Sequence, residues 1–541
     1  MSNKFRKMIF LIRKLKVFIH MTKRIIILFL LLLNIQVFSQ EKFWVFFTDK
    51  KDVQFNPYEY FDAKAIERRI KNNLSLQDST DFPLNTDYVQ KIKELIDSVS
   101  TYTRWFNGML VYADTVQIQK INKLSFVRKV QVVPHRYFAL ASLTRFSEKT
   151  VEHLRKQQIA SFQGEYFINK NINGKGIRIA VFDGGFKNVD THPAFKYLRD
   201  NHKIIATYDF TKNKEFVYGY IAHGREVLSN IAGLYNGKPL GLATEAEFLL
   251  ARTEIAAEPL AEEEYWLAAV EWADKNGADI INSSLGYTNQ RYFNYQMDGT
   301  SLVARAGNLA AKKGILVVNA AGNEGDLSYW KYIGTPADAD SVLTVGGIDP
   351  ETSYHMSFAS YGPTADGRRK PNVSAFAYAT VADEKDLTTA YGTSFACPLT
   401  TGFAACVLQI HKEYTAMQLF HEIEKSAYLY PYYDYAHGYG IPQASYFFKE
   451  SKKQTIASFR VSLSKGILEV EMLNPVSCSL KKNYMYYHIS DKNGKLKEYK
   501  LIEVYQKKVL ELNLDKYSKT DVLRIHYKGY TYETTLSSLE K

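Results

Sequence analysis

Apolar residues occur with two different spacings in the central part of the 541-residue chain. Between about residues 150 and 450, short continuous apolar runs alternate with segments of helical spacing. Strands covered on both faces read as continuous apolar runs, whereas the helices that cover them bury only one stripe. The pattern predicts a doubly wound α/β domain with a mostly parallel sheet. Its predicted strands are 177–182, 278–282, 314–318 and 341–348, and its predicted helices include 263–276 and 301–313.

The two flanking regions show different patterns of apolar and polar residues. Residues 41–148 combine strand-like runs at 43–47 and 127–133 with helical spacing at 61–70 and 89–99, which predicts a small α/β module. The central domain is then expected over 149–449. Residues 450–541 contain six short strand-like runs and predict a small β-sandwich. Those runs are 458–463, 467–472, 485–489, 498–504, 508–514 and 522–527.

The positive charge of the chain is concentrated at its N-terminus. The net charge is +12, but residues 1–40 hold eight Lys or Arg and no acidic residue, so the charge does not favour a nucleic-acid partner. Lys23 and Arg24 precede an apolar run over 25–38, which is too short to cross a ~30 Å hydrocarbon core but typical of a signal peptide. We expect residues 1–40 to be a cleaved leader, with no stable membrane span afterwards. The protein is then secreted or held at the cell surface, association with the outer membrane is left open, and an uncleaved anchor is the alternative.

The cysteine residues give no sign of a metal centre, while contact of the acidic run 262–264 with a metal ion is an alternative to a purely structural role. Cys397, Cys406 and Cys478 are too few for a disulfide framework and lack a zinc-binding spacing, so buried free thiols are expected. The acidic run 262–264 is expected to begin a solvated helix, where the helix dipole favours negative charge.

Residues suited to nucleophilic catalysis stand at the ends of predicted strands and the starts of predicted helices. Asp183 ends the first strand, His223 opens a helix, and Ser394 lies at the start of another helix. Amide hydrolysis by a serine needs a hydroxyl, an imidazole that takes its proton and a carboxylate that orients the imidazole. Asn323 directly follows another strand, where its amide could donate to an oxyanion. Because parallel sheets gather functional groups at the carboxyl ends of their strands, we expect these side chains to meet.

Together, these segments resemble the subtilisin-like serine proteases, or subtilases. Residues 392–398, Gly-Thr-Ser-Phe-Ala-Cys-Pro, match the family's Gly-Thr-Ser-x-Ala-x-Pro signature at every defined position. Residues 321–323, Ala-Gly-Asn, match the segment of the oxyanion Asn, and residues 282–286 match the strand that flanks the substrate. The order Asp, His, Ser is that of subtilisin. The resemblance covers about residues 150–447.

The resemblance implies a secreted serine endopeptidase that cleaves polypeptides through an acyl-enzyme. Ser394 would be the nucleophile, His223 the general base and acid, and Asp183 the orienting carboxylate, while Asn323 and the Ser394 N–H would form the oxyanion hole. No cofactor is required for such chemistry, and a structural calcium ion is an open expectation. The residues implied for the primary specificity pocket are Ser284, Leu285, Gly286, Ala320, Ala321, Gly322 and Gly334. A glycine at 334 would leave room for an apolar or aromatic substrate side chain.

The resemblance also bears on the flanking regions. Residues 41–148 would be a pro-region that assists folding and acts as an intramolecular inhibitor, with a permanent N-terminal domain as the alternative. A processing site is expected near 140–146. Residues 450–541 loosely resemble the β-sandwich sorting domains that some Bacteroidetes attach to exported enzymes, and a binding module is equally compatible.

Three departures from the family pattern leave other functions open. Gly184 stands where Ser or Thr usually follows the catalytic Asp, Arg225 where Thr usually follows His-Gly, and Asn372 where Asp is commoner. None removes a catalytic atom. The alternatives are a non-catalytic subtilase-fold scaffold, an acid-active sedolisin-type peptidase that uses Glu instead of His, and a membrane-tethered adhesin.

Overall fold

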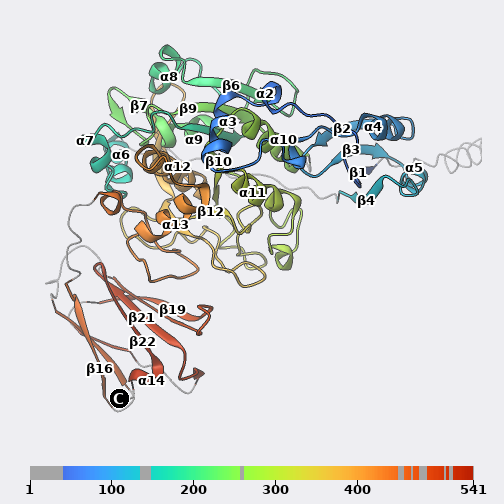
Figure 1. Cartoon of the computed structure of the whole chain (residues 1–541). Helices are drawn as coiled ribbons and strands as arrows, with labels where there is room; N and C mark the ends of the chain where they lie inside the picture. The colour runs from blue at the N-terminus through green and yellow to red at the C-terminus, as the bar shows by residue number, and fades with distance from the viewer. Residues whose placement is uncertain are drawn as a thin grey trace, which may run out of the picture. The chain divides into compact units, whose positions relative to one another are not determined.

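The computed structural model describes most of the chain. The described ranges are 41–133, 148–255, 261–448, 456–464, 467–473, 484–504, 507–510 and 516–539. The predicted leader, the predicted processing stretch and Cys478 lie outside them. The chain divides into two compact units, which are drawn with the rest of the chain in Figure 1. The described part of the first comprises 41–51, 84–102 and 108–133, and the second comprises 52–83, 103–107 and the described residues from 148 onward.

The first unit is a four-stranded sheet with two helices. Its strand order is β2-β3-β1-β4, from β1 (Glu41–Phe47), β2 (Ser98–Thr103), β3 (Gly108–Ala113) and β4 (Val127–Val132). The helices are α4 (Thr86–Lys93) and α5 (Thr115–Ile121). Val45, Val111 and Ile92 belong to one buried core that joins the sheet to α4. The predicted helix over 89–99 is therefore wrong beyond Lys93, because the β-branched residues from Ser98 onward pair as a strand.

The second unit is built on a seven-stranded parallel sheet. The order is β13-β12-β11-β10-β5-β9-β6, and every neighbouring pair is parallel. The predicted strands are confirmed as β5 (Arg178–Asp183), β10 (Ile280–Ser283), β11 (Leu316–Ala320) and β12 (Val342–Ile348). The strands that the sequence analysis did not identify are β6 (Ile204–Asp209), β9 (Glu247–Arg252) and β13 (Val373–Phe376).

Helices cover both faces of this sheet, as Figure 1 shows. Ile179 and Val181 of β5 join the core formed with α9 (His223–Ala232) and α12 (Thr393–Ile410). Phe182, on the opposite face of β5, stacks edge-on against Trp266 of α10 (Glu262–Lys275), beside which lies α11 (Leu302–Lys312). Alternate residues of one strand thus face different helix layers, which confirms the doubly wound α/β architecture.

Helix α12 runs through the centre of the main core. Sixteen of its residues are buried. Within the described part of the chain, it is the one helix whose length and composition would allow it to cross a membrane, and most of it is enclosed by this domain.

The remaining elements of the second unit are short or peripheral. The helices are α2 (Pro57–Tyr60), α3 (Ala63–Lys71), α6 (Glu148–Ala160), α7 (Glu165–Asn169), α8 (Lys196–Asp200) and α13 (Ala416–Ser426). The 3₁₀ turns are η1 (Ser79–Asp81), η2 (Pro193–Phe195), η3 (Asn294–Gln296) and η4 (Ala444–Phe447). Two hairpins pair β7 (Leu234–Tyr235) with β8 (Lys238–Pro239) and β14 (Tyr378–Ala382) with β15 (Leu387–Tyr391).

The C-terminal region forms a β-sandwich, as the sequence predicts. One sheet has the order β16-β17-β20 and the other β19-β18-β21-β22. Leu468, Met485 and Ile525 come from both sheets and share one buried core. The elements are β16 (Phe459–Ser464), β17 (Ile467–Met472), β18 (Tyr484–Ser490), β19 (Leu496–Glu503), β20 (Lys507–Leu510), β21 (Val522–Tyr527), β22 (Tyr530–Thr535) and α14 (Leu536–Leu539). Of these strands, β22 was not predicted.

A cluster of three aromatic side chains, one of them from α12, offers a test of this core. Phe403 is fully buried, and its ring centroid lies 5.4 Å from those of Phe162 and Phe167. Phe403→Ala should lower the free energy of unfolding by about 3–5 kcal/mol, because it leaves a cavity. Phe293→Ala, at a half-exposed position, should change it by no more than about 0.5 kcal/mol. Urea denaturation of the two variants measures the difference, and equal effects would contradict the central position assigned to α12.

Candidate active site

The predicted catalytic segments meet at the carboxyl-terminal edge of the parallel sheet. Asp183 is the last residue of β5, and Ser283 is the last residue of the neighbouring strand β10. Ser283 pairs in register with Phe182 of β5 and with Asn319 of β11. The segments that follow β10 and β11 therefore leave the sheet beside Asp183. This edge is where open α/β sheets assemble binding sites.

Asp183 and His223 form a close, buried pair. His223 is the first residue of α9, and its Nδ1 lies 3.0 and 2.9 Å from the two carboxylate oxygens of Asp183. The carboxylate is fully buried and accepts a further hydrogen bond of 2.7 Å from the N–H of Gly184. A Cβ atom on Gly224 would lie 2.4 Å from the carbonyl oxygen of Gly185, so glycine after the histidine permits this approach.

The carboxylate changes the acid–base behaviour of His223. Burial lowers the pKa of the imidazole, but the charge of Asp183 and its hydrogen bond outweigh that effect and raise the pKa to about 9. About one third of the side chain is exposed, at 32%. Because Nδ1 faces the carboxylate, Nε2 is the nitrogen left to accept a proton in the neutral ring.

Ser394 lies at the start of α12. Gly392 precedes the helix with φ 143°, a backbone conformation that favours glycine. The Ser394 hydroxyl is nearly buried and donates to the carbonyl oxygen of Ser284 at 3.2 Å, and no hydrogen bond to His223 is present among the described residues. In return the Ser284 hydroxyl donates to the carbonyl oxygen of Ser394 at 3.0 Å. Ser394 and the segment after β10 are therefore linked by two hydrogen bonds.

Thr393 holds the amide of Asn323 in one orientation. Asn323 Oδ1 accepts hydrogen bonds from the N–H of Thr393 at 2.9 Å and from its hydroxyl at 3.0 Å. With the oxygen engaged, the amide nitrogen is the group available to a ligand. The Ser394 N–H lies in the first turn of α12, where helical N–H groups have no acceptor within the helix. Thr393 was not assigned a role from sequence, although it lies inside the Gly-Thr-Ser motif that could have indicated it.

Glu324 is a second residue near this amide that the sequence analysis missed. Its Oε2 accepts from the N–H of Asn323 at 2.8 Å and from the Ser360 hydroxyl at 3.0 Å. Burial raises the pKa of the Glu324 carboxyl above its ordinary value. An acidic residue after Ala-Gly-Asn carries no pattern of its own, because Ser360 lies 36 residues further along the chain.

The residues predicted for the specificity pocket lie on two neighbouring segments of the same edge. Asn319 Nδ2 donates to the carbonyl oxygen of Leu285 at 2.9 Å and so ties the segment after β10 to that after β11. Gly334 lies next to them, because Tyr287 and Thr335 form a bridge. A Cβ atom on Gly334 would lie 2.8 Å from the Tyr287 carbonyl oxygen, so glycine there permits close contact between backbones. The pocket role of Ser284, Leu285, Gly286, Ala320, Ala321, Gly322 and Gly334 stays a prediction.

The two departures nearest the site have local explanations. A Cβ atom on Gly184 would lie 2.9 Å from Ile221 Cδ1, so a Ser or Thr would displace that side chain. Arg225 is buried, with its Nε donating to the carbonyl oxygen of Ala382 at 3.1 Å and its guanidinium 3.6 Å from Asp383. Both features stabilise segments beside the site without replacing a catalytic atom.

The described residues contain neither a candidate metal-binding cluster nor a disulfide bond. Among those residues, no group of three or more His, Cys, Asp or Glu is placed to hold a metal ion. Cys397 and Cys406 are free and buried, as predicted. Glu262 and Glu264 are buried, and Glu262 Oε2 lies 2.7 Å from Arg291, so the expectation that residues 262–264 are a solvated helix start is wrong at both residues.

Comparisons with known proteins identify the class. Residues 174–440 match the profile described as subtilase family, and residues 42–152 match that of the peptidase S8 propeptide domain of Bacteroidota. The chain is similar to subtilisin DY of Bacillus licheniformis, with 28% identity over 255 residues that cover 47% of this chain and 84% of that protein. It is 29% identical over 289 residues to a thermostable alkaline protease of Halalkalibacterium halodurans, covering 53% and 72%. A solved cold adapted subtilisin-like serine proteinase is 24% identical, with a TM-score of 0.38 over 48% of this chain and 84% of that one.

The chain therefore belongs to the subtilase family, as its motifs indicated. It is a serine endopeptidase of this family, preceded by a propeptide domain that acts as an intramolecular inhibitor, and its substrates are polypeptides. The chemistry of this class requires no cofactor.

The Asp183–His223 pair generates a prediction about titration. Asp183→Asn removes the main influence that raises the pKa of His223 and leaves burial opposed only by the smaller effect of Glu226, so the pKa should fall well below about 9. NMR of the chain labelled at histidine ring carbons, followed from pH 5 to 10, would measure it. Asp386→Asn, which changes an acidic residue away from this pair, is the control and should leave the titration in place. A His223 pKa unchanged in Asp183→Asn would contradict the pairing.

Proposed function

We propose that Ser394, His223 and Asp183 are the catalytic triad of this peptidase. The single observation that carries the proposal is the two-oxygen contact of His223 Nδ1 with a fully buried carboxylate, beside a serine at the start of a helix. In this arrangement Ser394 Oγ attacks the carbonyl carbon of the scissile bond while His223 Nε2 takes the hydroxyl proton. Asp183 stabilises the imidazolium that results.

The same geometry supports an oxyanion hole formed by Asn323 and the N–H of Ser394. Negative charge develops on the carbonyl oxygen as the tetrahedral intermediate forms. Two N–H donors held in place beforehand stabilise that charge without reorganisation. His223 then donates its proton to the leaving amine, and the acyl group stays on Ser394 until water attacks by the same route, which restores the hydroxyl.

We further propose that the protein is exported by a leader over 1–40 and acts outside the cell or at its surface. The pro-region over 41–148 blocks the site until the chain is cut near 140–146, and the peptidase domain over 149–449 is then free to act. Ser284–Gly286, Ala320–Gly322 and Gly334 are proposed to line the primary pocket. A structural calcium ion, and a sorting or binding role for 450–541, remain proposals.

Labelling of the nucleophile tests the triad. A fluorophosphonate probe should modify Ser394 in the wild-type chain, identified by mass spectrometry, and should fail to modify Ser394→Ala. Self-processing should remove N-terminal residues from the wild type but not from the variant. Ser537→Ala is the control, because Ser537 is an exposed serine of the C-terminal region and its loss should leave labelling intact.

Absence of labelling has to be interpreted together with the pro-region. A wild-type chain that stays unlabelled is treated with an added protease that removes the N-terminal region, and then probed again. A chain that the probe still does not label after this treatment would be a non-catalytic scaffold, and the triad proposal would be wrong.

The oxyanion role of Asn323 has its own prediction. Asn323→Ala should lower kcat by about 10²–10³-fold with little change in KM, because the lost contact forms in the transition state. Asn294→Ala, at an exposed position, should leave both constants unchanged. Hydrolysis of a chromogenic peptide by the processed enzymes measures the two constants. A rise in KM alone would instead assign Asn323 to substrate binding.

A further inference from the structure

One segment of the propeptide domain leaves its own sheet and packs with the peptidase domain. Residues 52–83 lie in the chain between β1 and β2 of the propeptide sheet, yet they belong to the compact unit of the peptidase. Their helix α3 lies against the C-terminal end of α10 and the turn after α11. Figure 1 shows α3 in the same region as α10.

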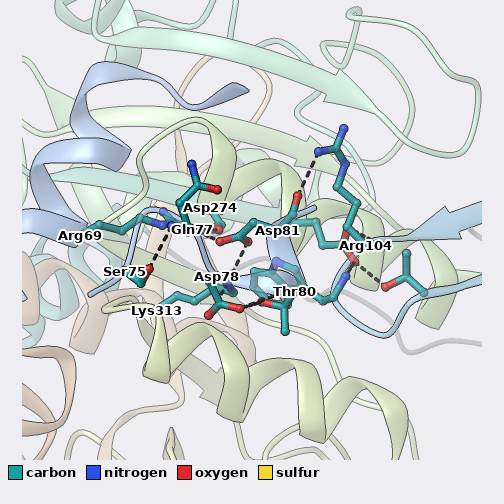
Figure 2. Close-up of polar contacts among 12 residues, drawn as sticks. Arg69, Ser75, Gln77, Asp78, Thr80, Asp81, Arg104, Asp274 and Lys313 are labelled. Carbon is teal, nitrogen blue, oxygen red and sulfur yellow. Dashed lines mark hydrogen bonds and ion pairs between the residues drawn. The ribbon is translucent and has the colours of Figure 1, made fainter. Parts of the chain in front are cut away.

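Five buried charged residues join the two parts, and most are labelled in Figure 2. Arg69 binds both carboxylate oxygens of Asp274, at 2.6 and 3.1 Å, and also Asp81 at 3.2 Å. Lys313 reaches the other oxygen of Asp81 at 2.8 Å. Arg68 pairs with Asp274 and donates to the carbonyl oxygen of Ala278.

All five side chains are almost fully enclosed. Arg68, Arg69, Asp81, Asp274 and Lys313 are each no more than 3% exposed. Three belong to the propeptide segment and two to the peptidase domain. Burying ions is costly unless they are paired, so the peptidase side of this contact accepts only a segment that supplies two cations and a carboxylate in these positions.

The backbone of the peptidase domain also fits this segment closely. Gly277 and Gly314 have φ of +75° and +86° in the turns before β10 and β11. A Cβ atom on Gly277 would lie 2.9 Å from the N–H of Ala65, and one on Gly314 would lie 2.9 Å from the Asn72 side chain. Side chains at either turn would therefore push α3 away.

Further contacts continue along the same edge. Lys64 Nζ donates to the carbonyl oxygen of Gly176 at 2.6 Å, and Arg178, the first residue of β5, lies 3.0 Å from Asp62. The docking surface thus follows the amino-terminal ends of β5, β10 and β11. The catalytic residues leave the carboxyl-terminal ends of the same strands, so the two sites lie on opposite edges of one sheet.

We propose that this surface is a second recognition site for the protein's own pro-region, which holds residues 52–83 after the connecting chain has been cut. Binding at this edge strengthens the association of the pro-region with the peptidase domain, in addition to any contact that the pro-region makes at the active site. Only a pro-region with matching charges can bind there. The inference rests on the inhibitory role of the pro-region.

The experiment separates this docking from the triad. A recognition sequence for a site-specific protease is inserted between residues 140 and 141 of the full Ser394→Ala chain, so no step needs the catalytic serine. After cutting, size-exclusion chromatography and dilution series measure how tightly the two pieces stay together. The wild-type network should hold them in one peak. Arg69→Met and Asp274→Asn should each weaken the complex by about a hundredfold or more, because each takes one ion from a buried network and leaves its partners with incomplete pairing.

Two further variants decide the interpretation. Glu67→Gln removes an exposed charge from the same helix and should leave the affinity unchanged. The double variant Arg69→Met/Asp274→Asn should lose less affinity than the sum of the two single losses, since both changes remove the Arg69–Asp274 pair. Losses that simply add would indicate separate folding defects and overturn the proposal. Wild-type pieces that separate as readily as the Arg69→Met pieces would overturn it as well.

Discussion

The contact between the buried carboxylate of Asp183 and the ring of His223 is the interaction on which the site depends. A carboxylate without access to water stays charged only if donors surround it, and here Gly184 and His223 supply them. The pair requires that β5 end and α9 begin at one point, and Gly224 gives the backbone the room to do so. The same carboxylate raises the pKa of His223 and, by its contact with Nδ1, leaves Nε2 as the other ring nitrogen.

The parallel sheet gives this protein two edges with different chemistry. At the carboxyl edge Asp183 and Ser283 end their strands in buried positions, whereas His223 and Asn323, in the segments that follow strands, remain accessible. At the amino edge the turns before β10 and β11 are narrow, glycine-containing and covered by α3. Catalysis needs an edge that a substrate can reach, whereas recognition by buried charges needs an edge that is covered and excludes water. A parallel sheet supplies both because all its strands point the same way.

Positioning at the active site comes largely from neutral hydrogen bonds, while the docking surface uses ion pairs. Thr393 orients Asn323 through two bonds to its oxygen, and Ser284 holds the backbone of Ser394. Such contacts fix geometry without adding charge beside the reaction. At the docking surface, Asp274 and Lys313 lose their partners if the pro-region leaves, and both regain water. This makes the contact selective yet reversible, since buried ion pairs contribute more to specificity than to net stability.

The sequence by itself determined the class of the protein, its catalytic motifs and most strands of the two β-rich parts, because apolar runs, turn residues and short motifs are local signals. It missed β2, β3, β6, β9, β13 and β22, and it extended a helix through 89–99 where Ser98 onward is a strand, since strand pairing outweighs local spacing. Only the tertiary structure decided that residues 52–83 pack with the peptidase domain and that Glu324 contacts Ser360. Those contacts join residues far apart in the chain, and no local pattern of charge or periodicity encodes which distant partner a buried side chain meets.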